Sequence, residues 1–198
     1  SPSSSIEHIG GFEANLAAKK RLEKLGFTVS FSEHYLENDI LDSASIESRV
    51  ADIHAAFSDD SVDAILATIG GFNCNELLPY LDFELIARHP KIFCGYSDTT
   101  ALLSAIYSKT GMKTYRGPSY SSFKMDALQD YQTESWLKAV SQTSYELTPS
   151  EKWGDNAWYL PDAPLTFHET EWKVYHHGQA QATVIGGNLS TFSLLRGT

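Results

Sequence analysis

The segment Gly-Tyr-Ser-Asp at residues 95–98 combines residue types that suggest hydrolytic chemistry. It follows the short apolar run 91–94 and precedes a helical pattern. A Gly-x-Ser turn between a strand and a helix can hold a nucleophilic serine on a strained backbone, with the helix N-terminus favouring negative charge. Ser and Asp are also preferred helix caps. Because Thr99 replaces the second glycine of the usual pattern, the residues alone favour Ser97 or Asp98 as a simple cap.

A second loop with chemical potential begins at Gly70-Gly71, where the apolar run 62–69 ends. In open parallel sheets, ligands bind beyond the carboxyl ends of the strands, where we expect both loops to lie. The diglycine amides could complete an oxyanion hole or hold a carboxylate, or the pair could be only a tight turn. A phosphate-binding loop is disfavoured, because no Gly-x-x-x-x-Gly-Lys pattern follows. Cys74 lacks an evident base, which favours a buried, inert thiol.

Large aromatic residues gather in the region 141–180. They are Trp153, Trp158, Tyr159 and Trp172. They could form the core of a small β layer, which is the commoner outcome, or a stacking platform for a flat ligand. His176-His177 in the same region lacks a third ligand at a recognisable spacing, so a surface role is favoured over a metal site.

Hydrophobic periodicity places these residues on an alternating series of helices and strands. Helical spacing of apolar residues predicts helices at 12–25, 46–57, 99–111 and 125–140, with short helical pieces between 76 and 89. Apolar runs or alternation predict strands at 27–31, 62–69, 91–94 and 113–118. This order is typical of an α/β fold with a parallel sheet and helices on both faces.

The texture of the sequence changes after residue 140, which suggests a division into three parts. We expect an α/β domain over 1–140, an irregular or β linker region over 141–180, and the start of a β-rich second domain over 181–198. The last part begins a helix for which Asn188 or Ser190 is a suitable cap.

Composition excludes several classes of partner. The 198 residues carry 15 Lys and Arg against 25 Asp and Glu, a net charge of −10, and have no basic stripe to neutralise nucleic-acid phosphates. No apolar run approaches the ~20 residues of a membrane span. Two cysteines, Cys74 and Cys94, do not make a disulfide framework, so we expect free thiols and a cytoplasmic protein.

Two long segments resemble a known family. The stretches "ATIGGFNCNELLPYLDFELIARHPKIFCGYSDTTALLSAIYSKTGMKTYRGP" and "WKVYHHGQAQATVIGGNLSTFSLLRGT" are similar to the LD-carboxypeptidases and microcin C self-immunity proteins, a family of serine peptidases. The resemblance implies a flavodoxin-like α/β domain, a β-rich C-terminal domain and a Ser-Glu-His catalytic set. It implies that Ser97 is the nucleophile, and that the backbone N–H groups of Asp98 and Gly71 form the oxyanion hole.

The sequence departs from this family pattern in two respects. The family's Glu and His follow the Gly-Gly-Asn-Leu segment, so we expect them outside this chain, and expect the chain to be a fragment that is nearly inactive alone. Murein-type members usually carry an Arg near the position of Glu76, which this chain lacks. Asn73 and Asn75 are more similar to the microcin-immunity branch.

The resemblance therefore predicts a hydrolase that cleaves an amide bond of a peptidyl- or aminoacyl-nucleotide. Gly70, Asn73 and Asn75 would contact the substrate, and Trp153 or Trp158 would stack on its base. No metal or organic cofactor is implied, and a homodimer is possible. A murein tetrapeptide carboxypeptidase is the alternative enzyme, and a non-catalytic small-ligand-binding domain is the alternative of another class.

Overall fold

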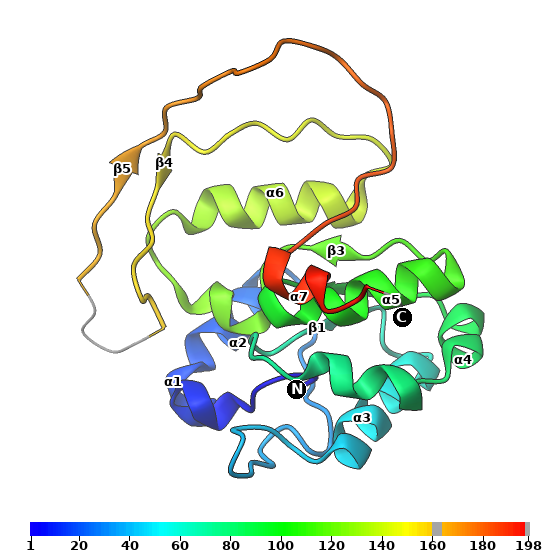
Figure 1. The fold of residues 1–198 in the computed structure, drawn as a ribbon. Helices are drawn as coiled ribbons and strands as arrows, with labels where there is room; N and C mark the ends of the chain where they lie inside the picture. Colours follow the sequence, from blue (N-terminus) through cyan, green and yellow to red (C-terminus); the bar gives the residue numbers. More distant parts are fainter. Residues whose placement is uncertain (160–163, 197–198) are drawn as a thin grey trace.

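The computed structural model describes residues 1–159 and 164–196, and it has a small parallel sheet at its centre (Figure 1). The strands lie in the order β1 (Ala64–Leu66), β2 (Ile92–Gly95) and β3 (Tyr115–Arg116). All neighbouring pairs are parallel, so the carboxyl ends of the three strands meet at one edge. The predicted α/β class with a parallel sheet is confirmed.

Alternating side chains on the strands point into two separate hydrophobic clusters. Ile65 and Phe93 are paired in register and pack into one cluster. Leu66, Cys94 and Tyr115 pack into the other. Because successive residues of a strand face opposite sides of a sheet, the two clusters lie on opposite faces, and both faces are covered.

The first cluster is closed by helices from the middle of the chain. They are α3 (Ile46–Ser58), η2 (Cys74–Tyr80), α4 (Phe83–Arg88) and α5 (Thr100–Thr110). Ser45 caps α3 by accepting from the Ser48 N–H at 3.1 Å, as the sequence pattern of a capped amphipathic helix requires. Gly111, at φ 73°, ends α5 in the left-handed conformation typical of helix C-termini.

The second cluster is closed by segments from both ends of the α/β part. They are η1 (Ile6–Ile9), α2 (Leu16–Lys24), η4 (Tyr120–Lys124) and α6 (Gln129–Ser141), with the short α1 (Gly11–Ala14) leading into α2. The predicted helix at 12–25 is thus interrupted at Asn15. The Asn15 amide donates to the carbonyls of Gly11 (2.7 Å) and Ile9 (3.2 Å), and this local bonding competes with a continuous helix.

The predicted strand at 27–31 is wrong. The segment has no regular secondary structure, and its apolar residues contact aromatic side chains instead. Phe27 packs on Trp136, with ring centroids 5.5 Å apart, and Phe31 packs edge-on against Tyr120 at 5.3 Å. Alternation predicts one packed face, but here Phe31 and Val29 are only partly buried and Phe27 is 38% exposed, and their contacts come from helices and loops instead of a neighbouring strand.

The C-terminal part of the described chain forms a long strap. It includes an antiparallel pair, β4 (Lys152–Trp153) and β5 (His168–Glu169), and then arches over α6 to return to α5 through α7 (Leu189–Ser193), as Figure 1 shows. Of the two predicted caps, Asn188 is the one that caps α7, by accepting from the Thr191 N–H at 3.0 Å, whereas Ser190 lies inside the helix. Residues 197 and 198 of the predicted segment 181–198 lie outside the described residues.

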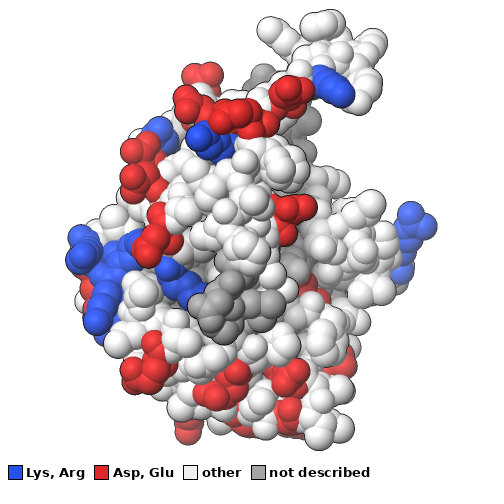
Figure 2. All heavy atoms as spheres, turned by 90° about the vertical axis from the view of Figure 1, so that its left-hand side faces the viewer, with Lys and Arg blue, Asp and Glu red and all other residues white. Residues whose placement is uncertain are grey.

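Charged side chains are distributed unevenly over the surface. Figure 2 shows one face, on which acidic side chains are scattered widely and basic side chains gather in a few places. On this face the basic side chains do not join into one continuous tract.

Candidate active site

Ser97 stands on a strained turn at the carboxyl end of β2. It lies two residues beyond Gly95 and begins the short helix η3 (Ser97–Thr99), which continues into α5. Its φ of 57° lies in the left-handed region, which costs a residue with a side chain about 1–2 kcal/mol. The side chain is half-buried, and its Oγ takes part in no hydrogen bond within residues 1–159 and 164–196. A strained serine between a strand and a helix is a candidate functional position.

Gly70 lies directly against Ser97. A Cβ added to Gly70 would come within 2.9 Å of the Ser97 Cβ and 3.0 Å of its Oγ, which is closer than real Cβ atoms approach. Gly95 is constrained in the same way, because its Cβ would lie 2.9 Å from the Ala67 Cβ. Gly70 therefore lets the diglycine loop meet the serine turn in van der Waals contact, and Gly95 lets the end of β2 pack closely against Ala67.

Gly71 packs on the other side of the loop, against the N-terminal segment. A Cβ there would overlap the hydroxyl of Ser3 and come within 2.6 Å of the Ser4 Oγ. The Ser4 N–H donates to the Gly70 carbonyl at 3.2 Å, and this bond holds the diglycine loop against the N-terminal segment. Among the described residues, the backbone N–H groups of Gly71 and Asp98 donate to no partner, so both remain available to an oxyanion.

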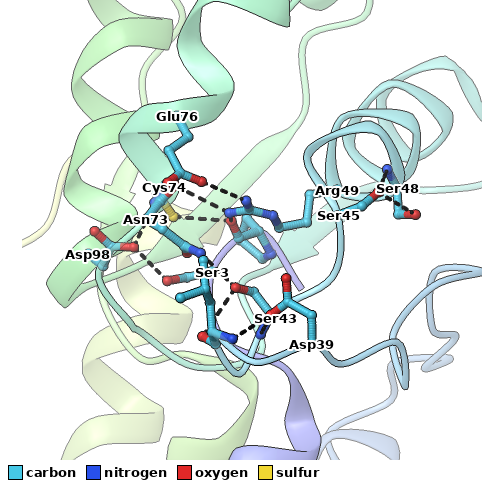
Figure 3. Close-up of polar contacts among 12 residues, drawn as sticks. Ser3, Asp39, Ser43, Ser45, Ser48, Arg49, Asn73, Cys74, Glu76 and Asp98 are labelled. Carbon is cyan, nitrogen blue, oxygen red and sulfur yellow. Dashed lines mark hydrogen bonds and ion pairs between the residues drawn. The ribbon is translucent and has the colours of Figure 1, made fainter.

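The Asp98 side chain turns away from the site into the protein. It is 2% exposed, and its Oδ2 accepts from the Ser3 Oγ at 2.5 Å and from the Cys74 N–H at 2.9 Å (Figure 3). The carboxylate of Asp98 therefore contacts Ser3 and Cys74, whereas its backbone N–H belongs to the turn at Ser97. Sequence reasoning assigned only the backbone group, because Ser3 lies 95 positions away in the chain.

The two asparagines of the diglycine loop differ in environment. Asn73 is 4% exposed, and its amide donates to the Ser43 Oγ at 2.6 Å, so it is directed into the protein and away from a ligand. Asn75 is half-buried in η2. The sequence predicted that both contact the substrate, and the structure gives Asn73 a bond that holds the loop instead.

Arg49 is a further residue that holds the loop, and sequence reasoning missed it, because the only signal was a charged residue within an apolar helical stripe. Its buried guanidinium donates to the Asn73 carbonyl at 3.2 Å and to the Glu76 Oε2 at 3.1 Å. These contacts join α3 to the segment between Gly71 and η2 (Figure 3). A planar guanidinium suits this position, because it can donate to a carbonyl and a carboxylate at once.

The two cysteines are free and buried. Burial, followed by the nearby Asp98 charge, raises the pKa of Cys74 well above its ordinary value of 9.0. Burial raises the pKa of Cys94 to about 12. Because the thiolate is the reactive form, these shifts disfavour both residues as nucleophiles. The expectation that Cys74 is buried is confirmed, and its inertness stays a prediction.

A hollow of about 340 Å³ opens next to Tyr96. It is lined by Tyr96, Arg116, Gly117, Pro118, Ser122, Met125, Gln132 and Trp158. Tyr96 directly precedes Ser97, so the hollow adjoins the serine turn. Desolvation lowers the pKa of Arg116. A second hollow of about 310 Å³, near Val62 and Lys91, lies at the opposite ends of β1 and β2, away from the serine.

The tryptophans separate into different environments. Trp158 lines the hollow, with the Lys124 Nζ 6.0 Å from its ring centroid. Trp153 is 49% exposed in β4 and packs on His168, with centroids 4.9 Å apart. Trp172 is 72% exposed. These side chains do not form the core of a β layer, because the region folds as an open hairpin and strap with little to bury them against.

The Gly-Gly-Asn-Leu segment docks beside the serine turn. Gly186 and Gly187 have φ values of 144° and 141°, which residues with side chains rarely adopt. A Cβ on Gly187 would lie 2.5 Å from the Thr100 Oγ1, and the Asn188 N–H donates to the same oxygen at 3.1 Å. Because Thr100 is the first residue of α5, this contact ties the end of the strap to the helix behind Ser97.

The model of the family "LD-carboxypeptidase N-terminal domain" matches residues 1–117, which include both the diglycine loop and the serine turn. The chain belongs to the LD-carboxypeptidase family. It is 50% identical over 200 residues to the protein named "Putative carboxypeptidase YocD" of Bacillus subtilis (strain 168), a match that covers 100% of this chain and 61% of that protein. It is 33% identical to the microcin C7 self-immunity protein MccF of Escherichia coli, which covers 93% of this chain and 58% of MccF.

Solved structures of the LD-carboxypeptidase family have the same fold. An MccF-like protein from Bacillus anthracis str. Ames superposes with a TM-score of 0.95 at 48% identity, over 100% of this chain and 60% of that one. MccF in complex with aspartyl sulfamoyl adenosine superposes with a TM-score of 0.86 at 32% identity, over 93% and 58%. The chain thus spans about three fifths of the length of these relatives.

The structure also bears on other classes of function. Within the described ranges, no helix has the length and apolar character needed to cross a bilayer. Over the same ranges, His, Cys, Asp and Glu side chains do not converge in groups of three or more that could hold a metal ion.

Proposed function

We propose that this chain supplies the nucleophile and the oxyanion hole of a serine hydrolase that cleaves an amide bond. Ser97 Oγ attacks the carbonyl carbon, and the N–H groups of Asp98 and Gly71 stabilise the negative oxygen that forms. The observation that carries the proposal is the left-handed backbone of Ser97, with an unengaged hydroxyl against Gly70. One such donor is typically worth about 2.7–4 kcal/mol of transition-state stabilisation.

The proton of Ser97 needs a base that the proposal assigns to the rest of the enzyme. By resemblance to the family, a histidine oriented by a glutamate accepts this proton and then gives it to the leaving nitrogen. The acyl group remains on Ser97 as an ester until water, deprotonated by the same histidine, releases it. Both residues are proposed to lie in the two fifths of the relatives' length that the chain does not span.

For the substrate, we propose a peptidyl- or aminoacyl-nucleotide. Solved complexes of MccF contain aspartyl sulfamoyl adenosine and glutamyl sulfamoyl guanosine. In this chain, the hollow next to Tyr96 is lined by Trp158, which offers an aromatic face to a base. Base stacking on an aromatic side chain is worth about 1–3 kcal/mol. Trp153 is a weaker candidate, because it lies in β4 and does not line this hollow.

The tryptophan assignment predicts an asymmetry between two variants of the full-length enzyme. Trp158→Ala should raise KM for aspartyl sulfamoyl adenosine about tenfold, which corresponds to ~1.4 kcal/mol of lost stacking. Trp153→Ala, a matched Trp-to-Ala change outside the hollow, should change KM less than twofold. Equal KM values in the wild type and Trp158→Ala would refute the stacking role.

The alternative substrate is a murein tetrapeptide, which the family description as LD-carboxypeptidases favours. Full-length protein should be incubated separately with a murein tetrapeptide and aspartyl sulfamoyl adenosine, with products read by mass spectrometry. We expect cleavage of the adenosine conjugate and none in Ser97→Ala. Cleavage of the murein peptide alone would reverse the substrate choice, and cleavage of neither would favour the non-catalytic binding domain. The cytoplasmic location and the homodimer stay predictions.

A further inference from the structure

The carboxylate of Asp98 contacts two chain segments other than its own. Its Oδ2 accepts from the Ser3 hydroxyl at 2.5 Å and from the Cys74 backbone N–H at 2.9 Å (Figure 3). Neither of these described bonds goes to η3, the helix that contains Asp98. A carboxylate that is 2% exposed is costly to bury unless it is well bonded, so these two bonds have to hold it.

These two contacts reach both ends of the diglycine loop. Ser3 packs against the Cα of Gly71, where a Cβ would overlap its hydroxyl. Cys74 is the residue at which the loop enters η2. The Asp98 carboxylate therefore touches the loop directly at one end and through the Ser3 hydroxyl at the other.

We infer that the Asp98 side chain is a positioning residue that sets the distance between the two oxyanion donors, its own N–H and that of Gly71. The inference rests on the proposed function, because it assigns the side chain a task within that oxyanion hole. One donor is the backbone N–H of Asp98 itself. The other is the N–H of Gly71, which packs against Ser3, and the Ser3 hydroxyl donates to the Asp98 carboxylate. A displacement of one donor by about 1 Å can cost on the order of 100-fold in rate.

The surrounding charges are consistent with this assignment. The nearby Arg49 directs its guanidinium to the Asn73 carbonyl and Glu76, and its described bonds do not include Asp98. The negative charge of Asp98 is therefore stabilised by its two hydrogen bonds, which are of the stronger, charge-assisted kind. An amide at this position would keep one acceptor oxygen of similar geometry, which separates the loss of charge from the loss of the contact.

The test compares three variants of the full-length enzyme by kcat and KM for aspartyl sulfamoyl adenosine. Asp98→Ala removes both bonds and should lower kcat about 100-fold with KM within about threefold. Ser3→Ala removes one bond and should lower kcat about tenfold. Asp98→Asn keeps an acceptor oxygen and should recover most of the kcat that Asp98→Ala loses.

The controls separate positioning from general stability and from the proposed function. Asp82→Asn changes the carboxylate that caps α4 at a remote site and should leave kcat unchanged. If Asp98→Ala does not fold, Ser3→Ala decides, because it leaves the bond to Cys74 intact. Lower melting temperatures with unchanged kcat in Ser3→Ala and Asp98→Ala would overturn the inference. Failure of the proposed function is seen separately, as equal rates in the wild type and Ser97→Ala.

Discussion

The backbone strain at Ser97 predicts that Ser97→Gly is more stable than Ser97→Ala, the reverse of the usual order of Gly and Ala in a helix or strand. Replacing Ser97 by Ala keeps a side chain in the left-handed region at φ 57°, whereas Gly tolerates that region without cost. Relief of the strain should favour Gly over Ala by about 1–2 kcal/mol. The greater conformational freedom of Gly in the unfolded chain lowers the stability of the Gly variant by about 0.4–1 kcal/mol relative to Ala. The net expectation is that Ser97→Gly is more stable than Ser97→Ala by about 0.8 kcal/mol.

Urea unfolding of the two variants of the full-length protein measures this difference. Neither variant has the hydroxyl, so the comparison is independent of activity. The control is Ala105→Gly in the middle of α5, where Gly should cost about 1 kcal/mol in the ordinary direction. If Ser97→Gly is also less stable than Ser97→Ala by about 1 kcal/mol, the turn is not strained and the argument for a nucleophile loses its basis.

Three further predictions concern the surroundings of the site. Gly187→Ala should displace the strap from α5 and lower kcat/KM at least tenfold, because its Cβ would lie 2.5 Å from the Thr100 hydroxyl; Gly178→Ala, with open space around its Cβ, is the matched control. The hydrogen bond to Asp52 raises the pKa of His34 above 6.5, so protonated His34 adds stability that is complete below pH 6.5 and lost as the pH rises through the folded-state pKa. The stability advantage of the wild type over His34→Gln, measured by urea unfolding, should therefore shrink as the pH rises; an advantage that grows would contradict this. Alkylation at pH about 8 should leave Cys74 unlabelled until urea is added, because burial raises its pKa; labelling of the native protein would contradict this.

The elements that the sequence predicted correctly are those with local signals. The helix cap at Asn188 and the helix stop at Gly111 depend on neighbours within a few positions, and both are present. The segment 27–31 failed because strand formation depends on a partner that periodicity does not identify. The break at Asn15 was missed because its amide can bond either outward or to its own backbone.

The candidate site divides in the same way. The structure brings Gly70 against Ser97, as expected from two loops at the carboxyl ends of neighbouring strands. The residue types alone favoured Ser97 or Asp98 as a helix cap, and this interpretation is wrong, because the described bonds of neither side chain cap η3. A nucleophile turn at Ser97 was implied by the family resemblance. The role of the Asp98 carboxylate depends on Ser3, and that of Arg49 depends on Glu76, 27 positions away. Pairings of this kind are created by the fold, so only coordinates reveal them. The same holds for the difference between Trp153 and Trp158, which the sequence left as equals.

The most direct test of the central claim is covalent labelling of the full-length protein with a fluorophosphonate, a reagent that modifies activated serines. Digestion and mass spectrometry then locate the modified residue. We predict a single adduct on the peptide that contains Ser97, lost in Ser97→Ala and in protein unfolded by urea. A native protein that remains unlabelled, or that is labelled at another serine while Ser97 is intact, would contradict the assignment of Ser97 as the nucleophile.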